Sequence, residues 1–352
     1  MPVADYGVWK ATATRYTYET DEQDSKSPHL SLYFSDDNPG EGRAAINIKS
    51  GDSSDSRLAF WTVPDFRHPI TQKLAALSNG FKGLAGADQA RPDSLALDYI
   101  RSNLFARQSG RILPHDIPGE KNDIIDVLKP IIDRTIEQNA HIYLYGSSFK
   151  DGKGIHNNHM NQGSPQRWAR DNGVYHDGGL IIEFEDHWEG VFIGFASQAV
   201  HTKDDQPKAG SPIPPTGYMT WADFLDPETD NDSHDTNEQT DSPVLITEAL
   251  VNPKGPDRQP GVAPETVTLR NRTDKDVDLT GWRVRNIVNQ FQNLPDGAVL
   301  PAGGTERFEV PNCPLSNQGG TITLLNAQGL KVHGVSYTNA QAHAEGISIS
   351  FK

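Results

Sequence analysis

The chain has 352 residues, enough for two domains of ordinary size, and although only 35% of them are hydrophobic, its 6 Trp, 13 Phe and 10 Tyr argue against a mostly disordered chain. The formal net charge is −15, which argues against broad, sequence-independent clamping of duplex phosphates but is compatible with a local basic groove. The single cysteine, Cys313, excludes an intrachain disulfide and a cysteine-rich zinc module.

The start of the chain and its hydropathy bear on where the protein resides. The opening residues MPVADYGVWK lack a basic stretch followed by an apolar stretch, so we expect no signal peptide. No run approaches the roughly 18 apolar residues of a membrane span, so we expect no transmembrane segment. The resulting expectation is a soluble cytoplasmic protein, with export by a route that uses no cleaved signal as the alternative.

Residues 5–50 are expected to be rich in β-structure. Alternating, β-branched or aromatic residues predict strands at 6–10, 12–18, 29–34 and 44–49, and another apolar stretch, 58–63, ends at Pro64. The next two segments, 70–86 and 93–106, are predicted to be helical, the second from a loose helical period of apolar residues.

The strongest helical pattern lies at residues 122–139. Asn122 is placed to cap this helix, and Pro130 must either kink it or begin a second helix. Strands are predicted at 141–145, 180–184 and 191–195. Together these elements predict an α+β first domain with a mixed or antiparallel sheet. It is expected to cover residues 1–225, because residues 218–225 are predicted to pack on the rest of this domain.

An acidic segment follows the first domain. Residues 222–243 contain eight Asp or Glu and no Lys or Arg, whereas residues 244–352 have ten acids and ten bases. Because like charges repel and little there can be buried, residues 226–243 are predicted to be an acidic linker. A calcium-binding loop is the alternative, but the glycine and ligand spacing of an EF-hand are absent.

Residues 244–352 return to short strands. These are predicted at 244–246, 266–269, 282–285, 306–310, 321–325, 332–337 and 347–351. Turn residues separate them, and no helical pattern intervenes. Seven or eight short strands in about 110 residues predict an antiparallel β-sandwich.

Four stretches of this second domain resemble a lamin tail domain. They are VLITEALVNP at 244–253, ETVTLRNRTDKDVDLTGWRVRN at 265–286, LPDGAVLPAGG at 294–304 and GGTITLLNAQGLKVHGVSY at 319–337. The resemblance implies an all-β immunoglobulin-like sandwich over residues 244–352. It also implies an appendage like those on secreted or surface hydrolases, including nucleases and phosphatases, which would bind protein, DNA or the cell surface.

The first domain carries a second set of matching motifs. They are YGVWK at 6–10, LDYIR at 97–101, PGEKND at 118–123, GIH at 154–156, HMNQG at 159–163, DNGVYHDGG at 171–179 and SQAVHT at 197–202. Through these motifs, residues 5–205 resemble the YukJ-like family of uncharacterised bacterial proteins. Because that family has no settled function, the resemblance implies no residue roles.

Residues 154–179 are the candidate functional segment, because packing alone does not explain their composition. Histidines, amides and bracketing glycines supply the donors, acceptors and backbone freedom that a ligand, metal or phosphate site requires. The residues expected to bind substrate are Lys153, Asn158, Asn161, Gln162, Trp168, Asn172 and Gln198.

The histidines of this segment allow three interpretations. His156 and His159 have H-x-x-H spacing, so with His201, or with Asp177 or Asp171, they would hold a divalent metal ion. Without a metal, His156, His159, His201 and Asp177 would supply a nucleophile and a general acid and base, while amides and Lys153 hold a phosphate. In the third interpretation the histidines are structural.

From these observations we expect a hydrolase, of phosphodiesterase type, that acts on nucleic acid or a phosphorylated polymer. The lamin-tail-like domain would then target or anchor the enzyme. The alternative is a non-catalytic binding protein that recognises a sugar or nucleotide through the His/Asn/Gln-rich segment. The chain contains no P-loop or dinucleotide fingerprint, which argues against kinases and dehydrogenases.

Overall fold

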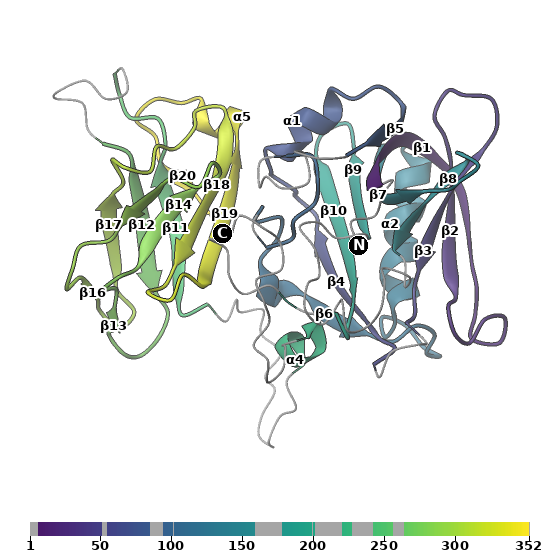
Figure 1. The fold of residues 1–352 in the computed structure, drawn as a ribbon, viewed down its shortest axis with the longest axis horizontal. Coiled ribbons are helices and arrows are strands. Elements are labelled where there is room, and N and C mark those ends of the chain that lie inside the picture. The colour runs from purple at the N-terminus through teal and green to yellow at the C-terminus, as the bar shows by residue number, and fades with distance from the viewer. Residues whose placement is uncertain are drawn as a thin grey trace.

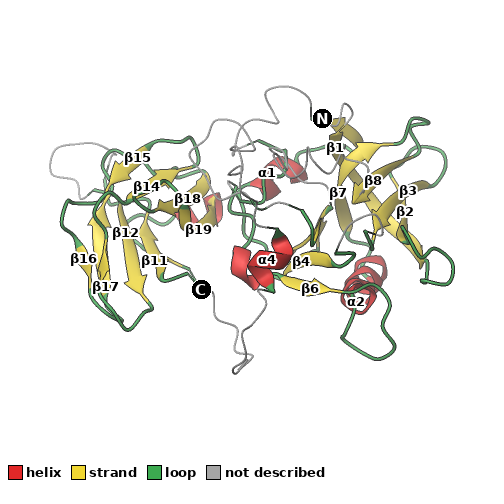
Figure 2. Ribbon diagram, turned by 60° about the horizontal axis from the view of Figure 1, so that its bottom comes forward, coloured by secondary structure: helices red, strands yellow, loops and turns green. Residues whose placement is uncertain are grey.

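The computed structural model describes residues 6–50, 55–84, 94–100, 102–158, 178–198, 200, 220–226, 242–255 and 264–351. Strands dominate these residues and helices are few (Figure 2). Strands β1 to β10 form one lobe and strands β11 to β20 form the other (Figure 1). None of the described helices is long and apolar enough to cross a bilayer.

A closed barrel lies within the first domain. Its strands are β1 (Tyr6–Tyr18), β2 (His29–Ser35), β3 (Gly42–Asn47), β7 (His141–Ser148) and β8 (Gly154–Asn158). Their spatial order is β1-β2-β3-β8-β7, and the pairing of β7 with β1 closes the barrel. The β3–β8 pair is parallel whereas the other barrel pairs are antiparallel, so of the two predicted possibilities, a mixed or an antiparallel sheet, the structure has the mixed one.

The sheet extends beyond the barrel because one edge of β7 serves two partners. The last residues of β7 pair with β8, and its first residues pair with β9. From β9 the sheet continues through β10 and β4 to β6, while β5 adds to β1. These strands are β4 (Leu58–Val63), β5 (Gly80–Gly83), β6 (Arg111–Leu113), β9 (Gly179–Glu183) and β10 (Trp188–Phe195).

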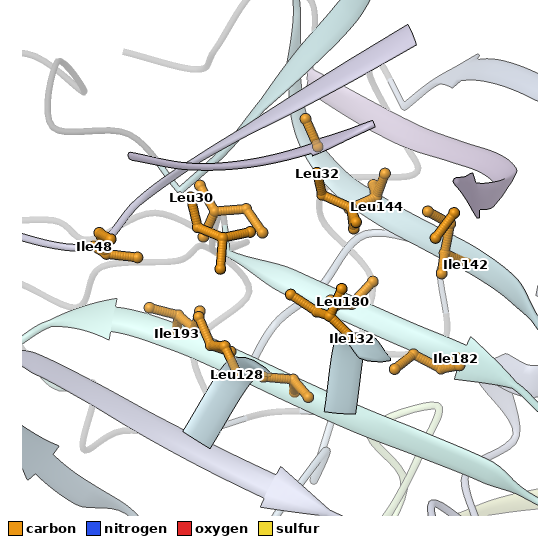
Figure 3. Close-up of a cluster of buried hydrophobic side chains, with 14 of the residues drawn as sticks. Leu30, Leu32, Ile48, Leu128, Ile132, Ile142, Leu144, Leu180, Ile182 and Ile193 are labelled. Atoms are coloured by element: carbon orange, nitrogen blue, oxygen red, sulfur yellow. The ribbon is translucent and has the colours of Figure 1, made fainter. Parts of the chain in front are cut away.

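Helix α2 (Ile124–Glu137) packs its apolar face against the barrel core. Its cap is Asp123, which accepts the Asp126 N–H at 2.9 Å, one residue later than the predicted Asn122. The helix continues through Pro130 as one element. Figure 3 shows Leu128 and Ile132 among aliphatic side chains of β2, β7, β9 and β10. Removing this apolar surface from water stabilises the contact between helix and barrel.

A second apolar cluster covers the other face of the extended sheet. Trp61 lies in this cluster with no exposed surface, stacked on Phe105 at 4.4 Å and edge-on to Trp221 at 4.6 Å between ring centroids. Trp221 begins α4 (Trp221–Leu225), so the chain just before the predicted linker packs on the first domain as expected. The predicted linker itself lies outside the described residues at 227–241.

Two predicted helices are wrong. Segment 70–86 forms only the short α1 (Ile70–Ala75), followed by strand β5, and the described residues of 93–106 contain turns but no helix. Leu97, Tyr99 and Leu104 are nevertheless buried, because they pack as an irregular segment against the sheet. Their spacing reflects burial rather than a helical repeat, so the first domain is mostly β with few helices.

Buried His68 makes the stability of the first domain depend on pH. Its ring contacts Ser102 O at 2.6 Å through Nε2 and the Ile70 N–H at 3.0 Å through Nδ1, an arrangement that suits the neutral ring. Burial lowers the pKa of His68 from 6.5 to about 4. Between pH 6.5 and about pH 4 the unfolded chain binds a proton at His68 that the folded chain does not. The free energy of unfolding that neutral His68 contributes is therefore complete above this pH window and is lost as the pH falls through it.

We expect a His68→Gln variant to be less stable than the parent chain at pH 7 but to lose less stability on acidification. Urea-unfolding midpoints measured between pH 6.5 and pH 4, the window set by this pKa shift, give the two slopes. His141→Gln, at a more exposed position on β7, is the control and should lose less stability at pH 7 than His68→Gln. Equal slopes in His68→Gln and the parent chain would contradict the assignment.

The second domain consists of antiparallel sheets with the orders β17-β12-β11-β20 and β15-β14-β18-β19, and a β13-β16 ribbon. The elements are β11 (Val244–Leu250), β12 (Thr266–Asn271), β13 (Val277–Asp278), β14 (Arg283–Asn286), β15 (Phe291–Asn293), β16 (Val299–Leu300), β17 (Thr305–Glu309), β18 (Gly319–Leu325), β19 (Lys331–Thr338), α5 (Asn339–Ala342) and β20 (Ile349–Ser350). One apolar core contains side chains from both four-stranded sheets. The predicted antiparallel architecture is confirmed, and it is consistent with an immunoglobulin-like sandwich.

Candidate ligand-binding site

The candidate segment begins in a strand of the barrel. A tight turn joins β7 to β8, and in it the Phe149 N–H donates to Gly154 O at 2.7 Å. Ile155 is buried in the barrel core, so strand alternation places the next residue, His156, on the outward face. The His156 ring is half-buried and meets the Phe149 ring edge-on, with centroids 4.5 Å apart. The barrel therefore fixes the position of one predicted site residue.

The two amide residues at the end of β8 hold the backbone. Asn157 is fully buried, and its Nδ2 donates to Tyr145 O and Gly179 O, both at 2.9 Å. Asn158 is 2% exposed, and its Nδ2 donates to Asn47 O at 2.7 Å. These bonds tie β8 to β7, β9 and β3. The amide nitrogen of Asn158, expected to bind substrate, therefore serves the scaffold of the site.

Two other predicted binding residues lie in different parts of the domain. Lys153 is exposed in the turn before β8, on the strand connection that also carries Phe149. Gln198 is buried just beyond β10, where its backbone carbonyl accepts the backbone N–H of Trp221 at 2.9 Å. Gln198 thus anchors α4, and among the described contacts nothing brings it to His156.

The remaining predicted site residues lie outside the described residues. They are His159, Asn161, Gln162, Trp168, Asn172, Asp177 and His201, together with the alternative ligand Asp171. Within the described part of the chain, no group of three His, Cys, Asp or Glu could hold a metal ion. Of the expected metal ligands only His156 is described, so the metal site stays a prediction.

Two neighbouring cross-strand rows lie on the outward face of the barrel, and the first of them contains His156. In the first row, Ser31 of β2, Ala45 of β3 and His156 of β8 are aligned. In the row beside it, Tyr33 of β2 is aligned with Arg43 of β3. Sequence reasoning missed these residues, although the alternation that predicts β2 and β3 identifies their outward positions.

The two arginines on this face have different partners. The Arg15 guanidinium lies 3.5 Å from the Tyr33 ring centroid and binds both carboxylate oxygens of Glu41, which lowers the pKa of that carboxyl. Arg43 donates from Nε to Ser31 Oγ at 3.0 Å. Considering only the described residues, no carboxylate pairs with Arg43 within 4.0 Å. Arg43 is therefore the cation on this face that is best placed to meet an external anion.

Comparison with known proteins confirms both resemblances noted in the sequence. The family described as "Uncharacterized conserved protein (DUF2278)" matches residues 1–207, and the Lamin Tail Domain matches residues 237–339. The uncharacterized protein YukJ of Bacillus subtilis (strain 168) is 32% identical over 227 residues, which cover 60% of this chain and 96% of the relative. None of these descriptions gives an activity, so the function must be argued from the geometry.

Proposed function

Since the chain belongs to the family of uncharacterised conserved proteins (DUF2278), whose description names no activity, we propose a function from the geometry of its barrel. The first domain is a binding protein for an extended, phosphate-bearing ligand, and single-stranded nucleic acid is the ligand whose chemistry fits best. The observation that carries this proposal is the order of the barrel strands.

The barrel has the connectivity of the oligonucleotide- and oligosaccharide-binding fold. Counted along the chain, β1, β2, β3, β7 and β8 are the first to fifth barrel strands, and in space the fifth lies between the third and the fourth. Helix α2 directly precedes the fourth strand and packs against the barrel core. Barrels of this fold bind ligands on the face of their second and third strands and in the loops that join strands one to two and four to five.

In this chain those positions carry suitable side chains. The second and third strands present Tyr33 and Arg43, and the loop between the fourth and fifth strands contains Phe149, Lys150 and Lys153. Guanidinium and ammonium groups bind phosphate oxygens, while aromatic rings stack on bases in a sequence-tolerant way. Fold alone would not justify a function, but here the fold and the side chains select the same face. Because the cations are few and local, we expect binding that is moderate and sensitive to salt.

Hydrolysis is the second candidate function, and the outward position of His156 favours it. The imidazole of His156 could transfer a proton at a phosphodiester that binds to this face of the barrel. The expected partners of His156, namely His159, His201 and Asp177, would complete either paired-histidine chemistry or a divalent metal site. This candidate makes the same face the substrate-binding surface, so both functions share one binding test.

We expect Arg43→Ala to weaken binding of a fluorescein-labelled single-stranded oligonucleotide about tenfold, which corresponds to about 1.4 kcal/mol. The slope of log affinity against log salt should also fall by about 0.7 if one phosphate contact is lost. Fluorescence anisotropy over a salt series measures both quantities. Lys129→Ala, an exposed position on α2 with the same change of charge, is the control and should bind like the parent chain.

Two outcomes would overturn the nucleic-acid assignment. One is parent protein that shows no binding at low salt, and the other is Arg43→Ala binding with parental affinity and salt slope. Preferential binding of a neutral oligosaccharide would keep the barrel as a binding domain but replace the ligand class.

Incubating the same oligonucleotide with the protein separates the two candidate functions. If the domain is a hydrolase, the oligonucleotide is degraded, and His156→Ala should slow its degradation about 10²–10⁴-fold with little change in melting temperature. An intact oligonucleotide after incubation with or without divalent metal ions would support the non-catalytic function.

For the second domain, the proposed role is that of an immunoglobulin-like targeting or anchoring module. Its two antiparallel sheets and the Lamin Tail Domain match support the fold. Protein, DNA and the cell surface are the partner classes that this role would involve.

A further inference from the structure

A buried polar contact joins the two domains. Asn103 lies at its centre, 5% exposed and with a positive φ of 52°. Its Nδ2 donates to Thr323 Oγ1 at 3.1 Å and to Ile322 O at 3.3 Å, both on β18. Its backbone carbonyl accepts the Ser336 hydroxyl at 3.0 Å, and its Oδ1 accepts the Lys331 amine, both from β19. One first-domain side chain thus bonds to two neighbouring strands of the second domain.

Charged side chains on both sides extend this contact. Lys331 is 7% exposed and its Nζ also donates to Ile100 O at 2.6 Å. From the first domain, Arg107, which is 8% exposed, donates to the Lys331 carbonyl of the second domain at 2.7 Å. At the edge of the contact, Gln108 donates to Ser242 Oγ at 3.0 Å. Both domains therefore supply donors and acceptors, and these buried groups are hydrogen-bonded across the interface as buried polar groups in stable proteins are.

The Asn103 side chain lies close against Gly334 of β19. A Cβ at this position would lie 2.2 Å from Asn103 Oδ1, so only glycine fits without displacement of the contact. The approach is therefore specific in shape as well as in hydrogen bonding.

The first-domain side of the contact is anchored in its own core. We call residues 99–108 the docking segment; residue 101 is not described. Trp61 Nε1 donates to Arg107 O at 3.0 Å, and the Tyr99 hydroxyl donates to Ile193 O at 3.1 Å. These bonds fix the docking segment to β4 and β10, so it is not a free surface loop.

We propose that the second domain is a fixed part of one folded body, held by the docking segment, and not a module that moves on the acidic segment as a tether. The partner that fits the β18–β19 face is the first domain of the same chain. In Figure 1 these strands face the first domain, whereas β17 and β12 lie on the far side. A targeting partner would then bind a surface of the second domain other than the β18–β19 face, such as the sheet with the order β17-β12-β11-β20.

Cleavage of the chain between the domains tests this proposal on the whole protein. A specific protease site is placed within residues 227–241, the purified protein is cut, and the products are analysed by size-exclusion chromatography under native conditions. The two fragments are expected to elute together at the volume of the uncut protein. Separate elution of two folded fragments would overturn the proposal, because the tether would then be what holds them together.

Variants of the contact sharpen this test. After cleavage, Lys331→Met and Gly334→Val are expected to release the fragments, whereas Lys275→Met, at an exposed lysine of the same domain, should not. Circular dichroism of each uncut variant establishes that it is folded. If Gly334→Val fails to fold, the comparison of Lys331→Met with the parent protein after cleavage still tests whether this contact holds the two domains together. Fragments that stay together equally in the parent and both variants would show that another surface holds the domains.

Discussion

Replacing Gly146 with alanine is expected to unfold the first domain. Gly146 has a φ of 147°, a backbone conformation that residues other than glycine rarely adopt. A Cβ there would lie 1.9 Å from the carbonyl oxygen of His156 and 3.0 Å from Asn157 Cα. Both are backbone atoms of β8, so rotation of a side chain cannot relieve the clash. The substitution would force β8, the strand that positions His156, away from β7 at the point where the two strands meet.

The expected cost exceeds about 4 kcal/mol, a range reserved for substitutions with a specific steric or backbone cause. Thermal unfolding followed by circular dichroism measures this loss. Gly83→Ala in β5 is the matched control, because no atom lies within 4 Å of its added Cβ, and it should change stability by less than about 0.5 kcal/mol. A Gly146→Ala protein that melts near the parental temperature would show that β8 does not hold the barrel as described.

Local patterns in the sequence were sufficient to predict many strands. Alternation at 29–34 identifies β2, and the apolar stretch at 58–63 coincides with β4, whose first four residues are buried and contribute to the clusters on both faces of the sheet. Closure of the barrel could not be predicted in the same way. It depends on the parallel pairing of β3 with β8, strands that are far apart in the chain, and β8 itself lies in a segment whose glycines and amides indicated a loop.

The composition of residues 154–179 predicted a candidate site, but it predicted the roles of the individual residues only in part. His156 belongs to an outward face, as a ligand-binding residue requires, but the amide nitrogens of Asn157 and Asn158 bond to backbone carbonyls. Composition cannot separate these roles, since an amide donates equally well to a ligand and to a carbonyl. The domain contact was beyond sequence reasoning, because Lys331 and Ile100 lie 231 residues apart.

Because Trp61 contacts residues far from it in the chain, we expect Trp61→Ala to destabilise the first domain and to weaken its contact with the second domain. Trp61 is fully buried and stacks on Phe105, which belongs to the docking segment. Its indole nitrogen donates to Arg107 O, and its ring meets Trp221 of α4. Removing the indole leaves a cavity among these groups and one carbonyl without its donor, at a cost of about 3–5 kcal/mol.

Chemical denaturation of the full chain measures the loss of stability, and the cleavage experiment measures the loss of docking. Trp188→Ala is the matched control, because Trp188 packs against the same apolar cluster but is only half-buried and stacks on Tyr143, which lies outside the docking segment. We expect the control to be destabilised less and to keep its fragments together. If Trp61→Ala lowers stability while the cut fragments stay associated, the docking segment does not depend on the first-domain core for its shape. If both properties change together, core packing around Trp61 is what presents Asn103 and Arg107 to the second domain.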